Sequence, residues 1–382
     1  IYVDPNGKNT NDYCVIANAK LTIEGYKEEP FVDYDKFKEL SYYDILLTSP
    51  SYNYNTESAH RLIMEREFVR KVSYEKINLY ANFEKPYREV FDWIAGNTRV
   101  LEECVEVGEI SNIDAFLTVL TNIYKVYKND LKGENGDVYE KMLIGLAAAR
   151  STNKLSSPLA FSHKSPTYDY VERFSIIKEL YDNGLILYGN GWKTYHVEFF
   201  RYIMNDSPRN DELKWINYIG RAKKYATGVY SYVQYVKPNY SKSAKPHLYD
   251  IANKDKYEKK WHLEEYGVPF ADNTTRFWMV MDAGGICWNQ ARTAKSVIIG
   301  MGRPSISVYQ PSHESALFYT AANSDGTGRG TWSITGNIFG WGKTANSWGG
   351  GNRTRTLFNW SGKSFTLSSI SASKYGDNAA YY

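Results

Sequence analysis

The chain has 382 residues, of which 46 are basic and 43 acidic, giving a net charge of +3. This length allows two domains or one large domain with a sizeable core. So balanced a charge argues against nucleic acid or an anionic membrane as partner. There is no run of about 18 apolar residues, so we expect no membrane span. The 34 tyrosines and the many asparagines are typical of an extracellular bacterial protein.

The three cysteines, Cys14, Cys104 and Cys287, are too few for a disulfide framework, although one Cys14–Cys104 bridge stays open. Few cysteines in an exported chain favour bacterial secretion, so we expect a secreted or cell-surface protein. The chain begins with Ile1 rather than Met, which favours a processed chain or a piece of a larger multimodular protein.

Residues 1–55 are rich in turn signals and carry no recognisable chemistry, so we expect an N-terminal arm or strap. Residues 56–250 are predicted to form a mainly helical lobe. Thr56 and Asn112 are predicted N-caps, and the residues after Asn112 have clear helical spacing. Residues 138–150 are apolar on most sides and are expected to be buried. Asn183-Gly184 is predicted to end a helix that starts near 168.

His196 and Glu198 are the one pair in this lobe that suggests a metal, but they are two residues apart. On a helix their side chains would point in different directions. We therefore expect no metal site and no cofactor.

Residues 251–382 contain the stretch with the strongest chemical signal. Gly284 and Gly285 permit a tight turn, and a helix with Ala291, Ala294, Val297 and Ile298 on one face follows. Cys287 lies at the start of that helix, where free N–H groups and the helix dipole favour a thiolate. The alternative is an ordinary buried cysteine, which is common in protein cores.

Three predicted strands follow the helix, at 305–309, 313–321 and 330–337, with His313 at the head of the second. The stretch from Asn323 to Gly328 is a turn signal between the second and third strands. A cysteine on a helix, a histidine on a strand and an Asx on the next strand follow the order nucleophile, base, orienting residue.

These residues resemble the transglutaminase-like superfamily of cysteine enzymes over about residues 275–345. The matching positions are Gly285-Ile286-Cys287, Gly302-Arg303-Pro304, His313, Trp332 and Asn337. The resemblance implies an α+β chain, with a helical N-terminal lobe and a papain-like core whose Cys-bearing helix packs on an antiparallel sheet. Family members usually have Asp at the third position. Here Asn337 is the best placed residue, and Asp325 is the other candidate.

The expected activity is acyl transfer by Cys287, with His313 as base and Asn337 orienting the imidazole. The enzyme would hydrolyse peptide or amide bonds of a protein, peptide or glycoprotein through a thioester, or pass the acyl group to an amine. The N–H of Cys287 is one expected oxyanion donor, and Trp278 and Gln290 are candidates for the second.

Residues beyond 337 are rich in glycine and tryptophan, with strands predicted at 354–360 and 364–370. Trp288, Trp341 and Trp348 are expected to line a substrate groove, although aromatic residues more often fill a sheet's core. Two other readings remain. One is an inactive glycan- or protein-binding module on the same scaffold. The other is a structural surface domain in which Cys287 and His313 only fill space.

Overall fold

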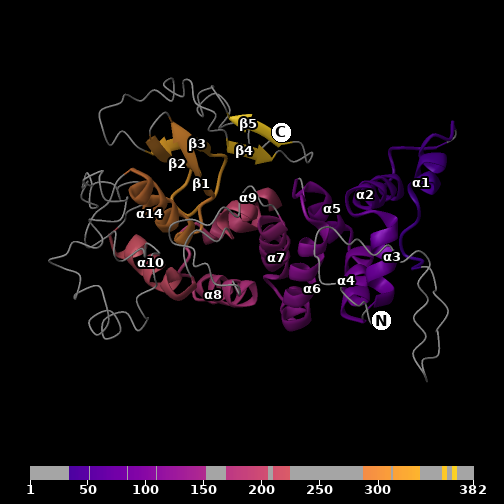
Figure 1. The fold of residues 1–382 in the computed structure, drawn as a ribbon, viewed down its shortest axis with the longest axis horizontal. Coiled ribbons are helices and arrows are strands. Elements are labelled where there is room, and N and C mark those ends of the chain that lie inside the picture. Colours follow the sequence, from indigo (N-terminus) through magenta and orange to yellow (C-terminus); the bar gives the residue numbers. More distant parts are fainter. Residues whose placement is uncertain are drawn as a thin grey trace, which may run out of the picture. The chain divides into compact units, whose positions relative to one another are not determined.

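A computed structural model describes residues 34–50, 52–83, 85–108, 110–151, 169–204, 210–223, 287–310, 313–335, 355–358 and 364–367. These residues belong to one compact unit. They are mostly helical, with a small three-stranded antiparallel sheet, so the chain is of the mixed α+β class, as the sequence predicts (Figure 1). Within these ranges, no helix combines the length and apolar character that crossing a bilayer requires.

The helices, in chain order, are α1 (Leu40–Leu47), α2 (Glu57–Val72), α3 (Tyr74–Phe83), α4 (Lys85–Gly96), α5 (Thr98–Glu106), α6 (Ile113–Tyr127), α7 (Gly136–Ser151), α8 (Tyr170–Asp182), α9 (Val197–Ile203), α10 (Asn210–Lys223) and α14 (Cys287–Gly300). Two short 3₁₀ helices are η1 (Asp130–Lys132) and η2 (Gly189–Lys193). The strands are β1 (Ser305–Gln310), β2 (His313–Thr320), β3 (Thr331–Thr335), β4 (Arg355–Phe358) and β5 (Ser364–Leu367).

The predicted helix ends are confirmed where the sequence carried capping signals. The Thr56 side chain accepts a hydrogen bond from the Ala59 N–H at 3.1 Å, and Asn112 accepts one from Ala115 at 3.0 Å. Helix α8 ends at Asp182 with Asn183 as its C-cap, and Gly184 follows with φ +64°. These caps supply hydrogen-bond partners to the N–H groups at the start of a helix and to the C=O groups at its end, which have none within the helix.

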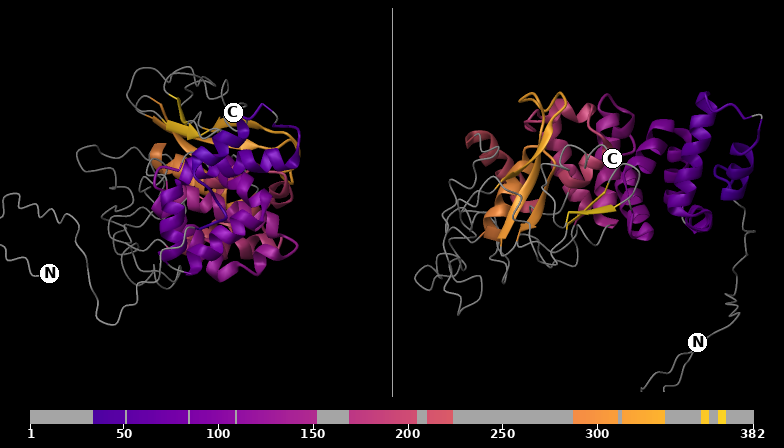
Figure 2. Two further views of the ribbon diagram at one scale, coloured as in Figure 1. Left: turned by 90° about the vertical axis from the view of Figure 1, so that its right-hand side faces the viewer. Right: turned by 90° about the horizontal axis from the view of Figure 1, so that it is seen from above.

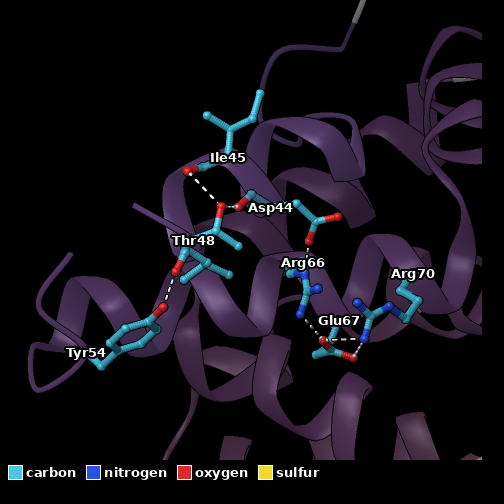
Figure 3. Close-up of polar contacts among 8 residues, drawn as sticks. Asp44, Ile45, Thr48, Tyr54, Arg66, Glu67 and Arg70 are labelled. Atoms are coloured by element: carbon cyan, nitrogen blue, oxygen red, sulfur yellow. Dashed lines mark hydrogen bonds and ion pairs between the residues drawn. The ribbon is translucent and has the colours of Figure 1, made fainter. Parts of the chain in front are cut away.

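Two helical features go beyond the sequence prediction. Residues 85–106 form two helices, α4 and α5, because the Asn97 side chain caps a new helix by accepting the Val100 N–H. Helix α1 lies inside the segment predicted as an arm, and a polar network joins it to α2 (Figure 3). In that network Arg66 donates to Asp44 at 2.6 Å and also to Glu67 at 3.2 Å.

Helix α7 forms the centre of the helical part. It contacts α6 on one side and α9 on another, and nearly all its side chains are buried, as predicted for 138–150. Gly145 permits the close approach of α9, because a Cβ there would lie 2.7 Å from the Phe200 carbonyl carbon.

Polar residues of α9 are also buried. Glu198 pairs with Arg201 at 2.8 Å, and His196 caps α9 by accepting the Glu198 N–H. Neither His196 nor Glu198 takes part in a metal-ligand group among the described residues.

Strands β1, β2 and β3 form an antiparallel sheet in that order. Its register pairs Gln310 with His313, Ser305 with Phe318, and Thr320 with Thr331. Strands β4 and β5 form a separate antiparallel pair, within the two stretches where strands were predicted. Figure 2 shows the three-stranded sheet, in orange, from two further directions.

The sheet and the helices share one hydrophobic core, which runs from Tyr34 to Trp332. Phe199 of α9 packs against Tyr319 of β2 at 4.8 Å and against Trp332 of β3 at 5.9 Å between ring centroids. Cys104 is a free thiol buried in the same core. The domain boundaries at residues 55 and 250 remain predictions.

Candidate functional site

Helix α14 begins at Cys287, as predicted, so the backbone of this cysteine forms the first turn. The N–H groups of a first turn have no partner within the helix, and the helix dipole is positive there. Both effects stabilise a negative charge at this position. Gly284 and Gly285, which precede the helix, lie outside the described residues.

The predicted packing face of α14 is confirmed, because Ala291, Ala294, Val297 and Ile298 are all buried. Thr293, Lys295 and Ser296, on other sides of the helix, are buried as well. Helix α14 contacts β1, β2 and α10 (Figure 1). The helix is therefore enclosed on several sides from Ala291 onward.

The helical part of the chain fixes the carboxyl end of α14. Three successive carbonyls there accept hydrogen bonds from distant residues. Asn217 Nδ2 donates to Gly300 O at 2.8 Å, Tyr188 N to Met301 O at 3.2 Å, and Trp192 Nε1 to Gly302 O at 2.8 Å. Because the last carbonyls of a helix lack intrahelical donors, these bonds satisfy them and join α14 to α10 and η2.

The Gly302-Arg303-Pro304 sequence forms a Schellman cap. The Gly302 N–H donates to Ile299 O at 2.8 Å, the Arg303 N–H donates to Ile298 O at 3.1 Å, and Gly302 has φ +84°. This left-handed conformation favours glycine. The cap ends α14 and turns the chain directly into β1.

Arg303 is fully buried and joins the cap to the far end of β2. Its guanidinium lies between the Tyr188 and Phe318 rings, 4.8 and 4.9 Å from their centroids. Its Nε donates to Tyr319 O at 2.9 Å, and Nη2 donates to the Thr320 hydroxyl. Burial lowers the pKa of the guanidinium from its usual value. The sequence predicts Arg303 only as part of the Gly302-Arg303-Pro304 turn, because its partners on β2 lie 16 and 17 positions away.

The lengths of α14 and β1 match, as they must if Cys287 and His313 lie toward the same end of this unit. The 14 residues of α14 rise about 21 Å toward the Gly302 turn. The 6 residues of β1 return about 20 Å from that turn. Strand β1 and α14 are also in contact. His313 pairs with that last residue, Gln310.

Asp325, the other candidate for the third position, lies in the turn at the opposite end of β2. The 8 residues of β2 separate that turn from His313 by about 23 Å along the strand. The Asp325 carboxylate accepts hydrogen bonds from the Thr327 N–H at 3.0 Å and the Thr327 hydroxyl at 2.7 Å. These bonds favour the charged carboxylate and so lower the pKa of Asp325, and they stabilise the turn. Asp325 therefore does not orient His313.

The other predicted site residues are placed only in part. Trp288 is the second residue of α14. Asn337, Trp341 and Trp348 lie outside the described residues, as do the candidate oxyanion donor Trp278 and the segment that contains it. In the part of the chain that the structure describes, no group of three or more His, Cys, Asp or Glu side chains is placed to hold a metal ion.

The chain was also compared with known proteins. No family model, no curated protein and no solved structure matches it.

Proposed function

We propose that the chain is a cysteine-dependent acyl-transfer enzyme with Cys287 as nucleophile and His313 as base. The observation that carries the proposal is the contact between α14 and β2. Cys287 opens the buried helix α14, and α14 contacts β2, the strand that begins with His313. The helix N-terminus favours the thiolate, and an adjacent histidine supplies the general base that such a nucleophile needs.

In the proposed reaction, His313 takes the thiol proton and the Cys287 sulfur attacks a carbonyl carbon of the substrate. The first-turn N–H groups of α14, including that of Cys287, stabilise the negative oxygen that forms. The C–N bond then breaks, the imidazolium gives its proton to the leaving amine, and a thioester remains. Water or a second amine, deprotonated by His313, attacks the thioester and releases Cys287. The substrate is a peptide, protein or glycoprotein amide.

Asn337 is proposed to orient His313. Strand β3 runs antiparallel to β2, from the Thr320 end toward the His313 end. Asn337 follows the last residue of β3, Thr335, by two positions in the sequence. An Asn side chain can accept the imidazole N–H and so select the tautomer that receives the thiol proton.

The test is acylation of the full chain by the activated ester p-nitrophenyl acetate, read by mass spectrometry of peptides. We expect one acetyl thioester, on Cys287, and none in Cys287→Ala. In His313→Ala the acylation rate should fall by about 10²-fold or more, because general-base assistance contributes about that much. Cys104→Ala is the matched control. Cys104 is fully buried, and burial raises the pKa of its thiol, so its loss should leave acylation unchanged.

Equal acylation of the wild type and His313→Ala would refute the assignment of His313. It would favour the second reading, an inactive binding module on the same scaffold. That reading draws its support from the Asn at the third position and from the tryptophans after it.

A further inference from the structure

A cleft of about 970 Å³ opens among α4, α6, η1 and the first turns of α5 and α7. Its lining residues all fall between Glu89 and Glu140, so none comes from α14 or the sheet. Its volume is at the upper end of the range of about 300–1,000 Å³ found for ligand sites. The site proposed above does not use it.

One wall of the cleft is aromatic. The rings of Trp93 and Tyr124 lie 4.9 Å apart with their planes tilted by 33°. Both residues line the cleft, and the Trp93 side chain is only half-buried. An aromatic face of this kind attracts C–H groups and cations, because its π-system is negative.

The charged residues of the cleft leave an excess of negative charge. Glu89 is paired with Lys128 at 3.1 Å, and Glu140 with Arg99 at 2.6 Å. The remaining charged lining residues are three carboxylates and one lysine, namely Asp92, Glu134, Asp137 and Lys132. A ligand with positive charge is therefore favoured over an anion.

Asp92 and Asp137 differ in the hydrogen bonds that their carboxylates accept. Asp92 accepts a hydrogen bond from the Tyr34 hydroxyl at 2.7 Å, which holds it in place without neutralising it. The Oδ1 atom of Asp137 is shielded from solvent and accepts no hydrogen bond from any residue that the structure describes. A buried acceptor without a donor is unfavourable, and the negative charge of Asp137 adds to the excess in the cleft.

We propose that this cleft binds a glycan chain whose sugars carry free amino groups. The C–H face of a sugar ring suits the Trp93 wall, its hydroxyls can donate hydrogen bonds to the carboxylates, and its ammonium groups match the excess negative charge. A lysine side chain of a peptide has the same charge, but it is small for a cleft of this volume and lacks the ring face and the additional donors.

The test uses the full chain and two probes that differ only in N-acetylation. We expect isothermal titration to show binding of the glucosamine trimer, and at least ten-fold weaker binding of the N-acetylglucosamine trimer. Binding of the cationic trimer should weaken as salt rises, because its ammonium groups interact with partly exposed carboxylates. Equal binding of the two trimers, or binding of neither, would overturn the proposal.

Matched variants locate the site. Asp137→Asn keeps the shape of the side chain and removes its charge, so we expect about ten-fold weaker binding of the cationic trimer. Trp93→Ala should weaken binding by at least as much, and its thermal melting must show that the helices remain folded. Glu75→Gln, at an exposed position of α3 outside the cleft, is the control and should bind like the wild type. Wild-type affinity in Asp137→Asn and Trp93→Ala would place the trimer elsewhere and overturn the proposal.

Discussion

Replacing Gly302 by alanine is expected to lower the free energy of unfolding by about 3–5 kcal/mol, among the largest effects of a single substitution. Two costs add. Gly302 has φ +84°, a conformation that costs an L-residue about 1–2 kcal/mol. A Cβ at Gly302 would also overlap Cγ2 of Ile186 and lie 2.9 Å from Cζ2 of Trp192, where two buried side chains cannot both withdraw.

A matched control in the same protein separates these two costs. Gly184 also has a left-handed conformation, with φ +64°, but a Cβ there would meet nothing within 4 Å. Gly184→Ala should therefore lose only the backbone term, about 1–2 kcal/mol. Urea unfolding of both variants gives the comparison. If Gly302→Ala lost no more than Gly184→Ala, the close packing of the α14 cap against the helical part would be refuted.

A double-mutant cycle tests which neighbour is responsible. Ile186→Ala removes the Cγ2 atom that the new methyl group would overlap. The loss in Gly302→Ala/Ile186→Ala should therefore be smaller than the sum of the two single losses. Additive losses would show that Ile186 does not obstruct the methyl group.

The second large effect concerns Glu103, a buried carboxyl on α5. Burial raises the pKa of Glu103 to about 8, while Lys141 and Arg99 reduce the rise and Glu140 adds to it. In the unfolded chain a glutamate titrates near its ordinary pKa of 4.5. The folded state therefore binds the proton more tightly. The free energy of unfolding should be highest below pH 4.5 and should fall as the pH rises toward 8, by an amount on the order of a few kcal/mol.

Glu103→Gln should remove this contribution, because glutamine is neutral throughout. We expect a shallower decline of the melting temperature between pH 4.5 and 7, and a variant more stable than the wild type at pH 7. The pKa values of Glu140 and Glu198 are raised to about 7 by burial, so some decline of the same sign should remain. Glu75→Gln is the exposed control. An unchanged pH slope in Glu103→Gln would contradict the buried, protonated state of Glu103.

Between pH 4.5 and 7, Lys71 does not contribute to the change of stability with pH. Burial lowers the pKa of Lys71 to about 7, and Lys71 donates to Cys104 O and Val105 O at 3.0 and 2.8 Å. Because the folded state holds this proton less tightly than the unfolded chain, Lys71 makes stability rise with pH, but only between about pH 7 and 10.5.

Local sequence signals predicted much of the secondary structure. Caps at Thr56 and Asn112, the Asn183-Gly184 stop and the Cys287 helix start all lie where the sequence placed them. These features depend on residues close together in the chain, which a sequence pattern records directly. The register of the sheet could not be predicted in this way. Two registers that differ by one residue are formed by the same strand sequences, so a local pattern does not distinguish them.

The contacts that hold the candidate site together could not be predicted in the same way. Trp192 donates to Gly302 across 110 positions, and Asn217 donates to Gly300 across 83. No spacing rule connects residues so far apart. The buried charges were missed for a related reason. Glu103 and Glu198 look like surface residues of amphipathic helices, and only the packing of α5, α7 and α9 encloses them.

The candidate site itself was predictable to the level of its elements. The glycines, the alternation of apolar and polar residues, and the turn signal predicted a helix followed by strands. They also predicted that Cys287 starts the helix and that His313 starts a strand. The choice between Asn337 and Asp325 needed the direction of β2 and the bonds that Asp325 makes in its turn.

The rate of alkylation of Cys287 by iodoacetamide as a function of pH, in the wild type and in His313→Ala, tests the central claim most directly. Asp325→Ala, altered at the far end of β2, is the control. We predict a wild-type thiol that titrates well below the reference pKa of about 8.5. His313→Ala should lose this reactivity, and Asp325→Ala should keep it. A Cys287 that does not react, or one whose profile is the same with and without His313, would contradict the account of an imidazole-activated nucleophile.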